Sequence, residues 1–222
     1  MKSSKMLVAG ICIALVLWFY MFSPWTTELT NFWLNMSCSA IILTTVSMIG
    51  LHMGCSDAQA DKSCTSAHKG LTVRNTVVQV LLGIALAFVL WAIFWIGDKL
   101  SQIMFDFARN QVDNVYGMKE GTSPTLIALL LLFLIGPAEE LFWRGFVQKS
   151  MCDRMNPTTA FIVTTLIYAL AHIWSFNFML VMAALVAGAV WGLLYRIKPS
   201  LLPALIVSHA LWDALVFVII PI

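Results

Sequence analysis

The chain has 222 residues, of which 60% are hydrophobic and 11% are charged, and its formal net charge is +2. A soluble globular protein carries about 25% charged residues, so this composition excludes that class and is typical of an integral membrane protein. The small, scattered positive charge also excludes a nucleic-acid-binding surface. We therefore expect the lipid bilayer as a partner and no nucleic acid.

Seven segments are long and apolar enough to cross a membrane, which takes about 20 predominantly apolar residues. In chain order they are residues 6–22, 31–53, 77–97, 123–148, 157–175, 177–196 and 200–220. The first has a basic start like a signal peptide, but MFSPWTTE at its end offers no small-residue cleavage site, so we expect a retained helix. The sequence predicts an all-α polytopic membrane protein with about seven transmembrane helices.

A polar segment, residues 54–70, follows the second span and suggests a division of the chain. We interpret residues 1–76 as two amino-terminal transmembrane helices with a cytoplasmic loop, and residues 77–222 as a membrane core. Two cysteines and two histidines in or beside this loop can in principle bind zinc, although their spacing matches no established motif and a plain loop is the simpler interpretation. These four residues are His52, Cys55, Cys64 and His68.

Residues 98–116 are too polar to span the membrane. Apolar side chains recur there at i, i+3, i+4 and i+7 among charged and amide side chains, which predicts an amphipathic helix. The apolar positions are Leu100, Ile103, Met104 and Phe107. We expect this helix to lie in the membrane interface as a surface anchor, with a gate over a lateral substrate entrance as the alternative.

The sixth span contains small residues at intervals of four. They are Ala184, Gly188 and Gly192. Because small side chains let two helices approach closely, this stripe predicts tight packing against a neighbouring helix.

The basic residues predict the orientation of the chain. When successive loops are assigned to alternate sides, Lys99, Arg109 and Lys119 fall on one side, and the other ten of the thirteen Lys and Arg residues fall on the opposite side. By the positive-inside rule, the amino terminus is cytoplasmic and the carboxyl terminus is outside. We expect the membrane to be the plasma membrane of a prokaryotic cell.

Ionisable side chains occur within three of the predicted spans. Each costs about 2.5 to 3.5 kcal/mol to insert, so such residues usually pair inside the protein and mark function. They are Glu139, Glu140 and Arg144 in the fourth span, His172 in the fifth, and His209 and Asp213 in the seventh. His209 and Asp213 are four residues apart, as are Tyr168 and His172, so each pair projects from one helix face.

The two neighbouring glutamates point in different directions. Glu140 lies four residues before Arg144 on one helix face, which predicts an ion pair. Glu139 is rotated by about 100° from Glu140 and is left to face a cavity. Gly136 and Pro137 weaken the helix just before it, where a substrate or water needs room.

A carboxylate, two imidazoles and an aspartate in a shielded cavity suit the hydrolysis of an amide bond. That reaction needs a base for water, a group that stabilises the oxyanion, and a proton for the leaving nitrogen. A buried glutamate can take and return protons near neutral pH. Histidines can supply a second base or oxyanion donors, or hold zinc and a water with a carboxylate. Any one of these residues alone could be purely structural, but their concentration in three helices favours function.

Three short motifs carry these residues: EELFWRG at 139–145, YALAH at 168–172 and HALWD at 209–213. They resemble the EExxxR, FxxxH and HxxxN/D motifs of the CAAX-protease and bacteriocin-processing family, intramembrane proteases related to the prenyl-protein endopeptidase of eukaryotes. The similarity covers about residues 120–220. Tyr168 stands where Phe is usual and adds a hydroxyl that can bond into the site, and Asp213 stands where many members have Asn.

The resemblance implies an active site in a membrane cavity, where Glu139 activates water together with His172. His209 and Asp213 complete the site as oxyanion stabilisers or metal ligands, or Asp213 orients His209. The supporting residues are Glu140, Arg144 and Tyr168. The family has been described both as metalloprotease and as glutamate-type protease, so Zn²⁺ or another divalent metal held by the first four residues and a metal-free mechanism are both open.

The sequence therefore predicts an intramembrane endopeptidase, similar to CAAX prenyl endopeptidases, whose catalytic core is residues 77–222 and whose substrate is a peptide or a membrane-anchored protein. The alternative is a non-catalytic membrane protein with an immunity or adaptor function that binds a partner in the same cavity. A proton-coupled transporter is less favoured, because the expected inverted repeat is not visible.

Overall fold

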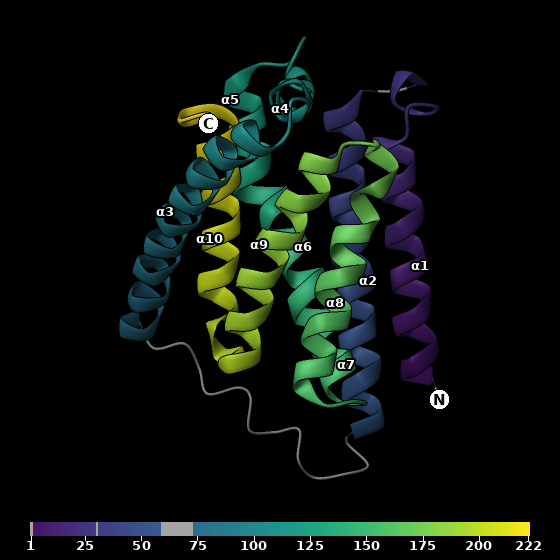
Figure 1. Ribbon diagram of the computed structural model, residues 1–222. Helices are drawn as coiled ribbons and strands as arrows, with labels where there is room; N and C mark the ends of the chain where they lie inside the picture. Colours follow the sequence, from purple (N-terminus) through teal and green to yellow (C-terminus); the bar gives the residue numbers. More distant parts are fainter. Residues whose placement is uncertain (1, 30, 59–72) are drawn as a thin grey trace.

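The computed structural model describes residues 2–29, 31–58 and 73–222, and within these residues the regular structure is entirely helical (Figure 1). Among these described residues, seven helical segments are long and apolar enough to cross a membrane. They are Ser4–Phe22, Phe32–His52, Asn75–Met104, Pro124–Cys152, Pro157–Ser175, Phe178–Ile197 and Pro199–Ile219. The predicted all-α polytopic fold is confirmed.

The first two spans are α1 (Lys2–Phe22) and α2 (Phe32–Ala58), which lie side by side. Both contribute to one hydrophobic cluster with the fourth span, in which Trp18 and Leu43 pack with Phe142 and Phe146. The division into 1–76 and 77–222 stays a prediction, but α1 and α2 share their core with the rest of the bundle. Cys64 and His68 of the possible zinc site lie outside the described residues.

The fourth span is one continuous helix that contains two π-helical stretches. Its parts are α5 (Pro124–Leu130), η3 (Leu131–Ile135), α6 (Gly136–Glu140), η4 (Leu141–Gln148) and α7 (Lys149–Cys152). The N–H of Gly136 bonds the carbonyl of Leu131, five residues earlier. Pro137 has no N–H, and the wider π turn accommodates it without breaking the helix. The weak point that the sequence predicts at Gly136 and Pro137 is therefore a local widening of the helix, directly before the two glutamates.

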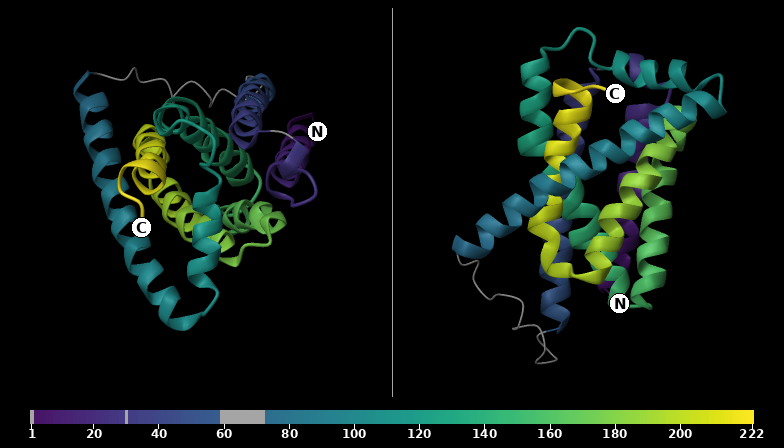
Figure 2. Two further views of the ribbon diagram at one scale, coloured as in Figure 1. Left: turned by 90° about the horizontal axis from the view of Figure 1, so that it is seen from above. Right: turned by 60° about the vertical axis from the view of Figure 1, so that its left-hand side comes forward.

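The remaining spans surround this helix. They are α3 (Val73–Met104), α8 (Pro157–Ala171) with the 3-10 turn η5 (His172–Ser175), α9 (Phe178–Ile197), and the last span, made of η6 (Pro199–Leu201), α10 (Leu202–Ala214) and η7 (Leu215–Ile219). A short 3-10 turn, η1 (Thr27–Leu29), follows α1. Figure 2 shows α3 crossing α10 obliquely at one side of the bundle.

The interfacial amphipathic helix is shorter than predicted. Residues 98–104 continue α3, and only α4 (Ala108–Gly117) lies across the end of the bundle (Figure 2). The physical reason is the oblique course of α3, because a tilted helix needs more residues to cross the same thickness. Leu100 and Ile103 are exposed on α3, whereas Asp98 is buried on its opposite face.

Hydrogen bonds fix α4 at both ends. The amide N–H of Met179 in α9 donates to Gln111 Oε1 (3.0 Å), and the Tyr116 hydroxyl donates to the carbonyl of Val216 in η7 (2.9 Å). The π-helical η7 leaves carbonyls free for such donors. Because these contacts hold α4 in place, they favour the predicted role as a surface anchor over the alternative role as a gate at a substrate entrance.

The small-residue stripe of α9 packs against α8, as predicted. A Cβ atom at Gly188 would lie 2.9 Å from Tyr168 Cδ1, and one at Gly192 would lie 3.0 Å from Phe161 Cδ2. Side chains at these two positions would push the helices apart.

A second close approach, between α3 and α10, gives a test of the packing. A Cβ atom at Gly83 would lie 2.6 Å from the carbonyl oxygen of Ala204 and 2.6 Å from Val207 Cβ. We expect Gly83→Ala to destabilise the protein by about 1 to 3 kcal/mol through overpacking. Thermal unfolding in detergent measures the change.

Gly97 on the same helix is the matched control, because a Cβ there meets nothing within 4 Å. Gly97→Ala should leave the melting temperature unchanged or raise it slightly, since Ala is favoured over Gly in helices by about 1 kcal/mol. Equal melting temperatures for both variants would contradict the α3–α10 packing.

Candidate active site in the membrane

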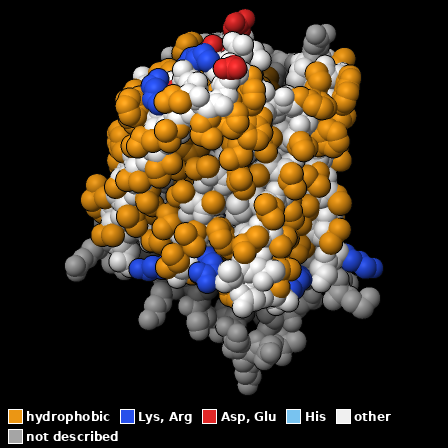
Figure 3. Space-filling view, in the orientation of Figure 1, with side chains coloured by type: hydrophobic (Ala, Val, Ile, Leu, Met, Phe, Trp, Pro, Cys, Tyr) orange, Lys and Arg blue, Asp and Glu red, His pale blue; other side chains and the backbone are white. Residues whose placement is uncertain are grey.

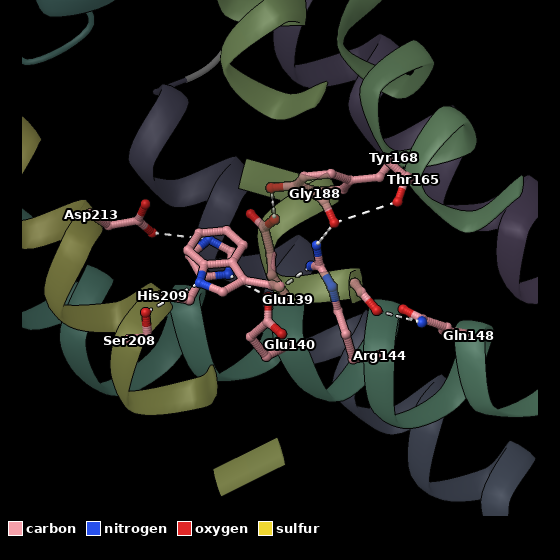
Figure 4. A network of polar contacts seen from close by, with 12 residues as sticks. Glu139, Glu140, Arg144, Gln148, Thr165, Tyr168, Gly188, Ser208, His209 and Asp213 are labelled. Carbon is pink, nitrogen blue, oxygen red and sulfur yellow. Dashed lines mark hydrogen bonds and ion pairs between the residues drawn. The ribbon is translucent and has the colours of Figure 1, made fainter. Parts of the chain in front are cut away.

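The carboxylate of Glu140 lies at the centre of a buried polar network (Figure 4). Its Oε1 atom accepts hydrogen bonds from Arg144 Nη1 (2.7 Å) and from His209 Nδ1 (2.9 Å). Glu140 is 0% exposed and Arg144 is 1% exposed, so the pair is removed from solvent. The predicted ion pair is confirmed, and the structure adds His209 as its third member.

The guanidinium of Arg144 also reaches the glycine stripe of α9. Its Nη2 atom donates to the carbonyl of Gly188 (3.3 Å), and Gln148, one turn later, donates to the carbonyl of Gly192 (2.8 Å). The stripe therefore does more than permit packing, because it lets side chains of the fourth span reach the α9 backbone. This role cannot be predicted from the sequence, because main-chain carbonyls leave no signal in a residue pattern.

Glu139 faces a different direction from Glu140. Its Oε2 atom accepts a hydrogen bond from the Tyr168 hydroxyl (3.2 Å), and its side chain lines a cavity within the bundle. The prediction that the hydroxyl of Tyr168 bonds into the site is confirmed. Glu140 is not among the residues that line this cavity, so the two glutamates differ as their helix positions predict.

His209 is held from three sides. Its Nδ1–H donates to Glu140, its Nε2 atom lies 3.5 Å from Asp213 Oδ2, and its ring stacks on Trp191 with centroids 3.9 Å apart. The predicted proximity of His209 and Asp213 is confirmed. Trp191 was not predicted as a site residue, because an apolar side chain in a span gives no functional signal.

His172 begins η5, the 3-10 turn at the end of α8, and both its ring nitrogens are engaged. Nδ1 lies 2.9 Å from the carbonyl of Tyr168, which can only accept, so Nδ1 carries the proton. Nε2 then has the lone pair, and it accepts a hydrogen bond from Trp18 Nε1 of α1 (3.1 Å). Trp18 was not predicted either, since 154 residues separate it from its partner.

The predicted active residues line one cavity of about 580 Å³. They are Glu139, His172, His209 and Asp213, and the supporting residue Tyr168 lines the cavity with them. The rest of the wall is mainly apolar and comes from the end of α1, the start of α2, the end of α3, α4 and the start of α9. The cavity thus extends from the polar network toward the end of the bundle that carries α4.

The donor set does not fit a metal ion in this arrangement. The lone pair on His172 Nε2 accepts a hydrogen bond from Trp18, so His172 offers no ligand atom in this arrangement. Among the described residues, no three His, Cys, Asp or Glu side chains are grouped to hold a metal. We therefore derive no step through a metal, and metal dependence stays a prediction to be tested.

Comparison with known proteins agrees with this geometry. Residues 121–215 match the model of a family described as type II CAAX prenyl endopeptidase Rce1-like. No curated protein and no solved structure matches the chain significantly. The matched segment contains all three motifs, whereas Trp18 lies outside it. The segment that carries the three motifs is therefore similar to the Rce1-like family of CAAX-type endopeptidases.

Proposed function

We propose that this chain is an intramembrane endopeptidase that hydrolyses a peptide bond in a peptide or a membrane-anchored protein. One observation carries the proposal: a carboxylate, a tyrosine hydroxyl, two imidazoles and a second carboxylate line a single, mainly apolar cavity. Such a cavity excludes bulk water and strengthens each electrostatic interaction inside it. The family match supports the same reaction class.

In this proposal, Glu139 is the general base. Its carboxylate faces the cavity and takes a proton from a water molecule whose oxygen attacks the carbonyl carbon of the substrate. Tyr168 orients the carboxylate through the hydrogen bond to Oε2. Glu139 then passes the proton to the leaving nitrogen as the C–N bond breaks, which yields a carboxyl group and an amine.

His209 is proposed to stabilise the oxyanion. Glu140 fixes its ring through Nδ1, and stacking on Trp191 holds the ring plane, so Nε2 points to the cavity side where Asp213 lies. A donor held in advance at the position of the developing charge lowers the barrier without reorganisation. Asp213 orients the His209 ring, and its negative charge compensates the positive charge that the ring carries when Nε2 is also protonated.

His172 is the second predicted water-activating residue, and that role stays a prediction. Because Nε2 accepts from Trp18 in this arrangement, the histidine can accept a proton only after the indole moves away. We therefore assign the proton transfer to Glu139.

Substitution of the two neighbouring glutamates should affect different properties of the protein. Glu139→Gln should lower peptide cleavage by about 10²-fold or more, because the base is lost while the fold is kept. Glu140→Gln should lower the melting temperature first, since unpairing a buried charge costs about 3 to 5 kcal/mol. Mass spectrometry of a peptide library incubated with purified protein, together with thermal unfolding, measures both effects.

Asp113→Asn is the control, because Asp113 pairs with Arg109 at the surface, where the side chains are 54% and 46% exposed. Such a pair contributes about 0 to 1 kcal/mol, so neither activity nor stability should change appreciably. Equal cleavage by wild type, Glu139→Gln and His172→Ala would contradict the proposed enzyme. If, in addition, the cellular phenotype survives Glu139→Gln but not changes in α4, the immunity or adaptor alternative holds.

Metal dependence has its own test. We expect purified protein to contain less than one metal ion per chain and to keep its cleavage rate after dialysis against a chelator, because both nitrogens of His172 are hydrogen-bonded and, among the described residues, no three His, Cys, Asp or Glu side chains are grouped to hold a metal. Elemental analysis and the rate before and after dialysis check this. A loss of activity that Zn²⁺ restores would overturn the metal-free mechanism.

We also propose that the cavity opens to the outside of a prokaryotic plasma membrane. Figure 3 shows Lys and Arg side chains but no acidic ones along the lower edge of this face, and both acidic and basic side chains near the upper edge, which carries α4. By the positive-inside rule, the basic end is cytoplasmic and the α4 end is external.

Labelling with a membrane-impermeant maleimide tests this orientation in a variant without native cysteines. Glu120→Cys, in the turn after α4, should react in intact cells, whereas Lys198→Cys, at the opposite end of α9, should react only after permeabilisation. The reverse pattern would place the cavity on the cytoplasmic side.

A further inference from the structure

Asp98 on α3 is a buried carboxylate that belongs to none of the three motifs. It is 7% exposed and lines the same cavity as the proposed active residues. The mechanism above gives it no role. Since a charged side chain is costly to place within a membrane span, its presence there calls for a function.

Only one of the two carboxylate oxygens of Asp98 has partners. Oδ2 accepts from Gln102 Nε2 (2.6 Å) and from Lys99 Nζ (3.3 Å). Oδ1 is buried and accepts no hydrogen bond from the described residues. A buried acceptor without a partner costs stability, and a ligand that donates to it recovers that cost.

The polar side chains near Asp98 at this end of the cavity already have other hydrogen-bond partners. The Ser101 hydroxyl donates to the main-chain carbonyl of Asp98, and the Tyr116 hydroxyl donates to that of Val216. The two other described cations of this end are also paired: Arg109 with Asp113, and Lys119 with the carbonyl of Phe217. Asp98 Oδ1 therefore remains available to a donor group that a ligand brings into the cavity.

The position of Asp98 relates it to the reaction site. Phe94, one turn earlier on α3, contacts the ring of Trp212 with centroids 4.6 Å apart, and Trp212 directly precedes Asp213. Four residues of helix rise about 6 Å, so Asp98 lies farther toward the α4 end than this contact. A Cβ atom at Gly97 would meet nothing within 4 Å, which leaves space beside Asp98.

We propose that Asp98 binds a cationic group of the substrate: a lysine or arginine side chain, or a free amino terminus. The apolar wall of the cavity binds the apolar residues that flank this group. The inference deepens the proposed function, on which it rests, by naming the substrate as an apolar segment with a basic group at a short distance from the cleaved bond.

Binding of synthetic peptides tests the proposal independently of cleavage. The protein carries Glu139→Gln so that no peptide is hydrolysed, and it is placed in nanodiscs of zwitterionic lipid. The probes are fluorescent, end-blocked peptides of leucine and alanine with one lysine, moved along the chain one position at a time. Each is paired with a peptide that has norleucine at that position, and fluorescence anisotropy gives the dissociation constants.

At one or a few positions, the lysine peptide should bind roughly tenfold more tightly than its norleucine partner, as expected for a desolvated charge pair. Asp98→Asn should remove this preference, and Asp113→Asn, which changes an exposed acid of the same end, should keep it. No preference at any position, or a preference that survives Asp98→Asn, would overturn the proposal. A preference without cleavage by the parent enzyme would instead support the cation site and refute the proposed endopeptidase.

Discussion

The carboxylate of Glu140 joins three helices inside the membrane. It accepts from Arg144 within its own span and from His209 of α10, while Arg144 continues to the backbone of α9. Each of these side chains is costly to bury alone, and the shared hydrogen bonds to Glu140 Oε1 offset part of that cost, while Glu140 Oε2 and Arg144 Nε have no hydrogen-bond partner among the described residues. The close approach of α6 and α10 makes this possible, because a Cβ atom at Gly136 would lie 2.6 Å from Ala210 Cα.

This network decides which groups remain for chemistry. Glu140 and Arg144 bind each other and the neighbouring helices, and His209 is held through Nδ1. The groups that face the cavity are therefore the carboxylate of Glu139 and the Nε2 side of the His209 ring. The π-helical turn before Pro137 places both glutamates on one uninterrupted helix. A structural carboxylate and a proposed catalytic one can therefore be adjacent in sequence.

Helices beyond the family segment complete the cavity. Trp18 from α1 donates a hydrogen bond to the lone pair of His172, and Asp98 from α3 and side chains of α4 line the cavity wall. All three lie outside residues 121–215. We infer that the shared segment supplies the reactive groups, while the preceding helices determine access to His172 and the choice of substrate.

The sequence by itself determined the seven spans, the Glu140–Arg144 pair and five of the polar residues that line the cavity, because apolar length and four-residue spacing are local properties of a helix. The tertiary structure alone decided which helices meet. It made the hydrogen bonds of His209 to Glu140 and of Trp18 to His172, whose partners are 69 and 154 residues apart in the sequence. It also brought the carbonyl of Gly188 to Arg144, 44 residues away. It also shortened the interfacial helix, since the tilt of α3 depends on its packing against α10. Helix periodicity orients a side chain about its own axis, but only packing sets what lies opposite.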